Sequence, residues 1–272
     1  MNTLTGQMDS RITGYIKASN LDTVKGAFEW EGGEDLVKPG LDNRRRTRIS
    51  FRTPDGEKIH LFMKRYYPVS LLKRLKSFFF ARARMAEAVV ECKNIQAMLA
   101  AGVPTMRVVA VGSENGLLGP VRSYIVVTLV PGDAIERCGK DFLDRHADMP
   151  EIISEFTSGL VTLASNMHMA GLVHRDFYSS HIFLHSREGG LSFYLIDLAR
   201  AFRPAFRMFR WRVKDLAQLK FSMPEKWVSK CWDDFIAGYL EVFDDPGITR
   251  WNSAIDARVS RMRRRMKRKE SK

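Results

Sequence analysis

The sequence predicts an α+β protein in which a sheet-rich lobe precedes a helical lobe. Three observations support this: an early hairpin pattern, a break at Pro131-Gly132, and helical periodicity that begins at Pro150. No internal repeat interrupts this order. We therefore expect two lobes joined by a connector near Leu129–Asp133.

The predicted sheet-rich lobe covers residues 26–130. It follows a polar, weakly patterned stretch at 1–25, for which we expect a loosely packed leader. Its hairpin turns at Pro54-Asp55-Gly56, a turn signal between two alternating runs. In chain order we predict strands at Arg48–Arg52 and Ile59–Arg65, a helix over Met85–Leu99, and strands at Val108–Val111 and Tyr124–Val130.

The predicted helical lobe covers residues 131–257. Apolar residues recur at helical spacing after Pro150, which suits a first turn, and Gly171 ends the pattern. The elements expected after it are a small hairpin of His181–Leu184 and Phe193–Ile196, helices from Val213 onward, and a basic tail at 258–272.

The net charge of +13 is the first unusual feature of the composition. Such a surface attracts nucleic acid, anionic lipid or phosphorylated glycan, and its sign alone does not choose among them. No stretch approaches the ~18 consecutive apolar residues of a spanning helix. The N-terminal stretch has no apolar core suited to a secretion signal, so we expect a cytoplasmic protein. The three cysteines are far apart in sequence, and we expect buried thiols without a chemical role.

The strongest functional signal lies between residues 171 and 200. The triplet His174-Arg175-Asp176 follows the long helix, and Asp197 directly follows an apolar run across a tight turn. This order predicts two carboxylates, 21 positions apart, at the ends of neighbouring short elements that face one cleft. Phosphoryl transfer needs such a pair. One carboxylate orients the attacking hydroxyl and accepts its proton, while another holds Mg²⁺ against the phosphates of ATP.

These residues resemble the protein-kinase-like superfamily, in its catalytic-loop triplet and its metal-binding aspartate. The segment HRDFYSSHIFLH, followed by IDLARA and FRWRVKDLAQLKFS, is similar to the lipopolysaccharide kinase family, and the likeness spans roughly residues 40–225. The resemblance implies a two-lobed protein-kinase-like fold and a kinase that uses ATP and Mg²⁺. Its acceptor would be a sugar hydroxyl of the lipopolysaccharide inner core, a heptose by the closer resemblance.

In the helical lobe, the resemblance assigns site residues one position at a time. Asp176 matches the catalytic base, and Arg175 and His174 belong to the loop that carries it. Asp197 stands where the family holds Mg²⁺. Asp215, in KDLAQL, matches a buried aspartate that braces the catalytic loop from a helix beneath it.

In the sheet-rich lobe, Lys64 matches the lysine that contacts the ATP phosphates. Glu91 is its expected partner, and Glu87, one helical turn away, is the alternative. Leu129, in the connector, completes the expected nucleotide-binding set. A glycine-rich loop is absent, and the matching region offers Gly40 and four arginines that can supply phosphate-binding charge, namely Arg44, Arg45, Arg46 and Arg48.

His181 departs from the protein-kinase pattern, which has an asparagine five residues after the base. It is either a second metal ligand or a buried, hydrogen-bonded histidine. Only 18 positions separate Asp197 from Asp215, too few for a long activation segment. This short spacing favours a glycan or small-molecule acceptor over a protein.

The expected partners are a lipid-linked glycan as substrate and an anionic membrane surface, with nucleic acid disfavoured. The basic tail and the basic, aromatic stretch Leu71–Arg84 are the candidate membrane contacts at the inner membrane. Two other readings stay open. One is a kinase of Kdo, of another envelope glycan or of a small metabolite. The other is a basic pseudokinase that binds without catalysis.

Overall fold

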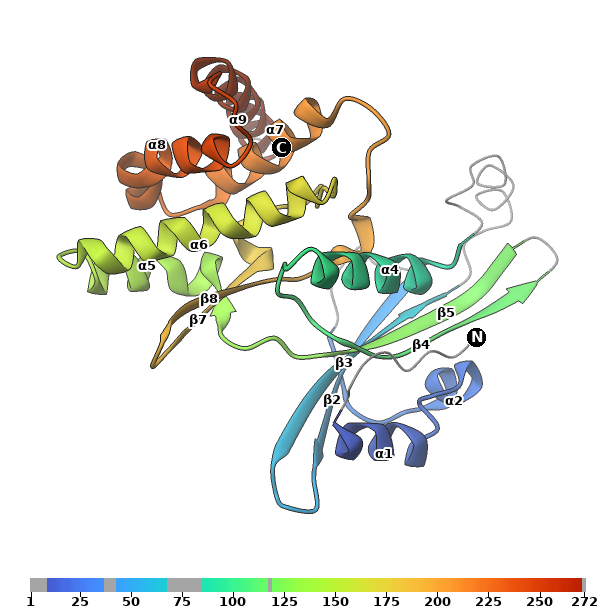
Figure 1. Ribbon diagram of the computed structural model, residues 1–272. Helices are drawn as coiled ribbons and strands as arrows, with labels where there is room; N and C mark the ends of the chain where they lie inside the picture. Colours follow the sequence, from blue (N-terminus) through green and yellow to red (C-terminus); the bar gives the residue numbers. More distant parts are fainter. Residues whose placement is uncertain (1–8, 37–42, 68–84, 117–118, 271–272) are drawn as a thin grey trace. The chain divides into compact units, whose positions relative to one another are not determined.

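The computed structural model divides into two compact units (Figure 1). It describes residues 9–36, 43–67, 85–116 and 119–270. Unit 1 comprises Met1–Gln96 and Met106–Leu129, and unit 2 comprises Ala97–Thr105 and Val130–Lys272. The predicted contributions of Gly40 and of the stretch Leu71–Arg84 lie outside the described residues.

Unit 1 is built on an antiparallel sheet with the strand order β1-β2-β3-β5-β4. The predicted hairpin is confirmed as β2 and β3, whose register sets Arg46 opposite Lys64. The predicted helix is confirmed as α4. The elements are β1 (Glu34–Asp35), β2 (Arg44–Arg52), β3 (Lys58–Tyr66), α4 (Glu87–Ala100), β4 (Val108–Gly116) and β5 (Gly119–Thr128).

The expectation of a loosely packed leader is wrong for residues 10–25. They form helix α1 (Ser10–Ala18) and the start of α2 (Val24–Glu29), and each helix is capped by a side chain, Asp9 and Thr23 respectively. Ile16 is fully buried in the core of unit 1, and Tyr15 stacks on Phe51 with ring centroids 3.9 Å apart. The sequence pattern hid this packing because helices this short owe most of their stability to tertiary packing, which the sequence alone does not show.

Unit 2 is mainly helical, with a three-stranded sheet of order β6-β7-β8. The predicted long helix is confirmed as α6, with Pro150 in its first turn. Figure 1 shows α6 running between α8 and the β7–β8 hairpin. The elements are β6 (Asp133–Ala134), α5 (Ile135–Arg145), α6 (Pro150–Met169), η2 (Ser179–His181), β7 (Ile182–Arg187), β8 (Gly190–Leu195), η3 (Leu198–Arg200), α7 (Met208–Ser222), α8 (Glu225–Glu241) and α9 (Ile248–Glu270).

The predicted boundary between helical lobe and basic tail falls inside α9. Trp251, Ile255 and Val259 are buried on this helix, which packs against α7. Beyond them the helix continues with side chains that are nearly all exposed through Arg268. The basic stretch is therefore the last part of one long helix rather than a separate tail.

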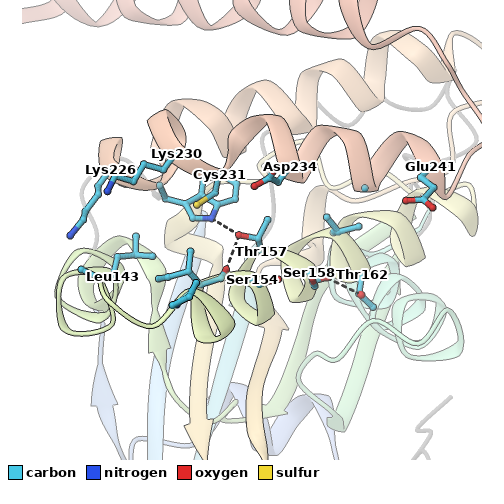
Figure 2. Close-up of a pocket in the computed structure, with 16 residues that line it drawn as sticks. Leu143, Ser154, Thr157, Ser158, Thr162, Lys226, Lys230, Cys231, Asp234 and Glu241 are labelled. Atoms are coloured by element: carbon cyan, nitrogen blue, oxygen red, sulfur yellow. Dashed lines mark hydrogen bonds between the residues drawn. The ribbon is translucent and has the colours of Figure 1, made fainter.

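A groove of about 590 Å³ runs between α6 and α8 (Figure 2). Trp227 lines the groove and donates an indole hydrogen bond to Thr157 Oγ1 at 3.1 Å. Lys226 and Lys230 lie at one end (Figure 2). None of the site residues predicted from the sequence lines this groove.

The three cysteines carry free thiols, as expected. Cys92 and Cys231 are buried, whereas Cys138 is half-buried, and burial raises the pKa of all three. No helix within the described ranges is both long enough and apolar enough to cross a membrane.

Candidate active site

In unit 1, Lys64 of β3 and Glu91 of α4 form a buried ion pair. Lys64 Nζ donates to Glu91 Oε1 at 2.5 Å, and the Glu91 side chain is 0% exposed. Residues two apart on a strand share a face, so Tyr66 lies beside Lys64 and donates to the other oxygen, Oε2, at 2.6 Å. Glu87 instead pairs with Arg44 at 3.2 Å, at an exposed position. Of the two glutamates proposed for Lys64, the structure pairs it with Glu91.

Tyr66 stays a hydrogen-bond donor in this pair. Burial, with the charge of Glu91 as the next cause, raises the pKa of its hydroxyl well above the ordinary value. A neutral hydroxyl and an ammonium group therefore share one carboxylate. Since both oxygens of Glu91 accept hydrogen bonds, its rotamer is fixed and the direction of Lys64 is fixed with it.

The four arginines predicted to supply phosphate-binding charge do not act as one cluster. The register of β2 against β3 places Arg44, Arg46 and Arg48 on the face that carries Lys64. Arg45 points to the opposite face, where its Nε donates to Asp35 Oδ2 at 2.6 Å. Leu129 follows β5 and is 45% exposed.

In unit 2, the catalytic-loop triplet is held from below by Asp215 of α7. The backbone N–H groups of His174 and Arg175 donate to Asp215 Oδ2 and Oδ1, at 2.7 and 2.9 Å, and Asp215 is fully buried. The sequence assigned this bracing position to Asp215, and these contacts match it. The backbone of the loop that ends at Asp176 is therefore anchored directly to α7.

His174 is a neutral structural residue in this loop. Burial lowers the pKa of its ring, and Nε2 lies 2.9 Å from the carbonyl oxygen of Ile196. The ring nitrogen Nδ1 accepts from the N–H of Asp176 at 3.2 Å. One ring thus links the residue before Asp197 to the residue proposed as base, which fixes the spacing of the two segments.

Arg175 adopts a left-handed backbone conformation, with φ of 74°. Its guanidinium lies over the rings of Phe202 and Trp211, at 5.5 and 5.8 Å from the ring centroids. Lys214 donates to the carbonyl oxygen of Arg175. Cation–π contacts and this hydrogen bond hold the sharp turn immediately before Asp176.

Asp176, His181 and Asp197 lie on adjoining segments of unit 2. His181 Nδ1 lies 2.8 Å from the carbonyl oxygen of Asp176, which can only accept, so Nδ1 carries the proton. In the neutral ring Nε2 holds the lone pair, and it lies 3.9 Å from Asp197 Oδ2. Asp197 itself follows β8 in a left-handed conformation, with φ of 59°. The imidazole nitrogen and the carboxylate oxygen that were predicted as metal ligands are thus close together.

A family model described as the lipopolysaccharide kinase (Kdo/WaaP) family matches residues 35–239. The chain belongs to this family. A solved structure titled "WaaP in complex with acyl carrier protein" has a similar fold, with a TM-score of 0.70 and 24% identity, and the match covers 96% of this chain and 97% of that one. The protein-kinase-like α+β fold predicted from the sequence, with a sheet-rich lobe and a helical lobe, is confirmed.

Curated relatives in the lipopolysaccharide kinase family are named lipopolysaccharide core heptose(I) kinase WaaP. The protein of Escherichia coli strain K12 is 32% identical over 167 residues, which cover 59% of this chain and 62% of the relative. That of Pseudomonas aeruginosa is 32% identical over 152 residues, which cover 54% of this chain and 56% of the relative. The chain therefore spans about six tenths of the length of the curated relatives it matches.

A kinase of this family would use Mg²⁺ with ATP, and the carboxylate of Asp197 suits that ion, whereas the imidazole of His181 is an uncommon ligand for it. Within the described residues, no group of three or more His, Cys, Asp and Glu side chains is arranged to hold a metal. Mg²⁺ is commonly bound through one or two carboxylates, with phosphate oxygens and waters completing its shell. Asp197, with His181 Nε2 nearby, matches such a sparse site better than a closed cage of protein ligands.

Three residues of this candidate site were missed in the sequence. They are Tyr66, Arg200 and His168. Tyr66 had a signal, because it lies two positions after Lys64 on the same strand face. Arg200 stands in the quoted IDLARA segment, yet nothing in that segment predicts its hydrogen bonds to Asp176.

His168 of α6 is a fully buried support for Asp215. Its Nε2 lies 3.5 Å from Asp215 Oδ2, and Nδ1 lies 2.8 Å from the hydroxyl of Tyr239. Burial lowers the pKa of His168, so the ring is held neutral. Buried side chains of α6 and α8 thus lie beside Asp215 of α7.

Proposed function

We propose that the chain is an ATP-dependent kinase that phosphorylates a sugar hydroxyl of the lipopolysaccharide inner core, most specifically a heptose. Family membership and the names of the curated relatives support the acceptor class. The observation that carries the reaction type is the braced loop of unit 2. Asp215 fixes the backbone before Asp176, and His174 ties that loop to the segment that holds Asp197.

In the proposed reaction, Asp176 accepts a hydrogen bond from the acceptor hydroxyl. The acceptor oxygen attacks the terminal phosphorus of ATP, and the bond from that phosphorus to the bridging oxygen of ADP breaks. The hydroxyl proton passes to Asp176, and ADP leaves with the electron pair of the broken bond. Asp197, with His181 Nε2, would hold Mg²⁺, which when bound offsets the negative charge of the phosphates.

Unit 1 carries the residues that we assign to ATP. We assign Lys64 to the ATP phosphates, with Glu91 and Tyr66 holding it in place. Arg46 lies opposite Lys64 on the same sheet face, which supports its assignment as a second phosphate contact. Leu129, at the end of unit 1, is assigned to the nucleotide base. These assignments replace a glycine-rich loop with side-chain charge.

The substrate we propose is lipid-linked, so the enzyme would work at the cytoplasmic face of the inner membrane. The end of α9 supports this placement. Six basic side chains are exposed there with no acidic residue among them: Arg261, Arg263, Arg264, Arg265, Lys267 and Arg268. Each basic residue near an anionic bilayer contributes about 1 kcal/mol of attraction. Anionic phospholipid is therefore the proposed surface partner of this helix end.

The decisive experiment supplies radiolabelled ATP and Mg²⁺ with a panel of truncated lipopolysaccharides and isolated core sugars. We expect label on the inner-core heptose with the wild-type protein and none with Asp176→Asn. Asp148→Asn, an exposed carboxylate of the same unit, is the matched control and should retain full activity. Label on Kdo would identify Kdo, rather than heptose, as the acceptor sugar, and the reaction type would stand. Label on serine or tyrosine of added peptides, or ATP binding without turnover, would overturn the proposed function.

A further inference from the structure

Arg200 occupies the carboxylate that the proposed reaction needs. Its Nη1 donates to both oxygens of Asp176, at 2.9 and 2.8 Å. An acceptor hydroxyl must approach one of these oxygens in order to hand over its proton. A guanidinium at this position places a positive charge where that proton has to arrive, and it opposes the transfer.

The ion pair can be exchanged, because it lies at the surface of unit 2. The Arg200 side chain is 56% exposed and that of Asp176 is 22% exposed. Ion pairs of this kind are weak in water, since solvent competes for both partners. Another anion with good geometry can therefore take Arg200 away from Asp176.

The backbone next to Arg200 is firmly held although its side chain is not. Arg200 is the last residue of η3, and the N–H of Ala201 donates to the carbonyl of Leu198 at 3.1 Å. One residue further, Phe202 and Val173 exchange two backbone hydrogen bonds, at 3.0 and 3.1 Å. Arg200 is thus a long, exposed side chain on a fixed base, and it can swing without moving the loop.

Two further cations lie close to Asp176, and both have other roles. Lys214 is half-buried and donates to the carbonyl of Arg175. The guanidinium of Arg175 lies over two aromatic rings. Of these three cations, Arg200 is the exposed one. Arg200 is therefore the cation beside Asp176 that is placed to bind a negatively charged group from solvent.

We propose that Arg200 binds an anionic substituent, a phosphate or a carboxylate, on the acceptor glycan close to the hydroxyl that is phosphorylated. Binding draws the guanidinium away from Asp176 and leaves the carboxylate free to accept the hydroxyl proton. A neutral acceptor leaves the Arg200–Asp176 pair closed. This inference rests on the proposed kinase function and names the class of acceptor that it selects.

The chemistry of the arginine side chain suits this task. Guanidinium is planar and offers parallel N–H groups that match two oxygens of a phosphate or a carboxylate. In the pair with Asp176 the single nitrogen Nη1 reaches both carboxylate oxygens, so an anion that engages two guanidinium nitrogens can replace that contact. Arg200 would then set acceptor specificity while taking no proton itself.

The test compares a neutral core glycan with the same glycan carrying one phosphate, or one carboxylate, on the sugar that bears the reacting hydroxyl or its neighbour. We expect the wild-type protein to favour the anionic acceptors in kcat/KM by about tenfold, the size of one charge-assisted contact. Arg200→Met should lose this preference, with a higher rate on the neutral glycan because Asp176 is no longer paired. Arg200→Lys should keep part of it. Arg203→Met changes a neighbouring exposed arginine outside the Asp176 pair, and should keep all of it.

Two kinetic outcomes would overturn the proposal. One is an Arg200→Met variant whose preference stays within about twofold of wild type, less than any charged contact would give. The other is a variant that loses activity equally on the neutral and anionic acceptors, which indicates a general structural role. A higher kcat/KM for the phosphate acceptor than for the carboxylate acceptor, or the reverse, would identify the anion that Arg200 binds better.

A binding measurement separates this proposal from the proposed function. Titration calorimetry with glucose 6-phosphate, and with glucose as its neutral control, needs no phosphoryl transfer. We expect Arg200→Met to bind the phosphate sugar at least about fivefold more weakly than wild type or Arg203→Met. Equal affinities would refute anion binding by Arg200 even if the kinase activity were confirmed. If no acceptor were phosphorylated, the kinase function would fail, and this measurement would still decide the role of Arg200.

Discussion

The two ion pairs of the candidate site differ in nearly every physical respect. Lys64–Glu91 in unit 1 is buried, with side chains 10% and 0% exposed, and Tyr66 donates to the remaining carboxylate oxygen. Asp176–Arg200 in unit 2 is open to solvent, with side chains 22% and 56% exposed. Breaking a buried pair costs far more free energy than breaking an exposed one.

This contrast indicates different roles for the two ion pairs. A pair that is costly to break can hold a phosphate-binding cation in one place throughout the catalytic cycle. A pair that is cheap to break can open when substrate arrives. Unit 1 would thus be preorganised for ATP, and unit 2 would respond to the acceptor.

The largest expected effect comes from Asp176→Asn. The amide cannot accept the hydroxyl proton, so phosphoryl transfer should fall by about 10²- to 10⁴-fold. The free energy of unfolding should change by less than about 1 kcal/mol, because the pair with Arg200 is exposed. Acceptor phosphorylation and urea unfolding measure the two effects. If the Asp176→Asn protein stayed active, Asp176 would not be the catalytic base, and the comparison of the two ion pairs would say nothing about catalysis in unit 2.

Glu91→Ala should have the largest effect on stability. It removes the carboxylate to which Lys64 and Tyr66 both donate in a buried site. Loss of one partner of a buried pair costs about 3–5 kcal/mol, and urea unfolding should show it. Glu87→Ala, which breaks the exposed contact with Arg44, is the control and should cost less than about 1 kcal/mol. Similar losses in the two variants would contradict the contrast between buried and exposed pairs.

Tyr66→Phe asks whether the third member of the buried site matters. It deletes one hydroxyl and leaves the ion pair intact, so we expect a loss of about 1.5–3 kcal/mol, as for hydrogen bonds to charged groups. If Tyr66 also helps to aim Lys64, KM for ATP should rise more than kcat falls. Tyr15→Phe, at a half-buried tyrosine of α1, is the control for losing a hydroxyl in the same unit. If the midpoint of urea unfolding did not change, the Tyr66 hydroxyl would add nothing to stability, and the Lys64–Glu91 ion pair would act without it.

Much of this site could be predicted because its chemistry is local in sequence. The run from His174 to Asp197 combines a helix end, a tight loop and a short hairpin, and each has its own sequence pattern. Helix α6 and the β2–β3 hairpin were predicted for the same reason. Lys64–Glu91 came only from family resemblance, because 27 positions separate the two residues and no local pattern links them.

The residues that were missed depend on packing and rotamers. Asp176 and Arg200 are 24 positions apart, and their contact depends on how η3 turns after Asp197. The early helices were missed because burial of Ile16 depends on the sheet face it meets. His168 looked like one more polar residue on α6. Its contact with Asp215 exists only once α6 and α7 pack together.

The smallest effect that we expect is the change in stability caused by Arg200→Met. It is also the sharpest test of the difference between the buried and the exposed ion pair. Because its pair with Asp176 is exposed, the substitution should lower the free energy of unfolding by less than about 1 kcal/mol. Raising the salt concentration to ~1 M shortens the screening length to about 3 Å, and should erase most of that difference. The loss in Glu91→Ala should persist in the same salt, since water and ions do not reach a buried pair. Urea unfolding of both variants at low and high salt makes the test. A loss above about 2 kcal/mol in Arg200→Met that persists in high salt would exceed what an exposed pair can give. Arg200 would then be held too tightly for an acceptor to displace it from Asp176.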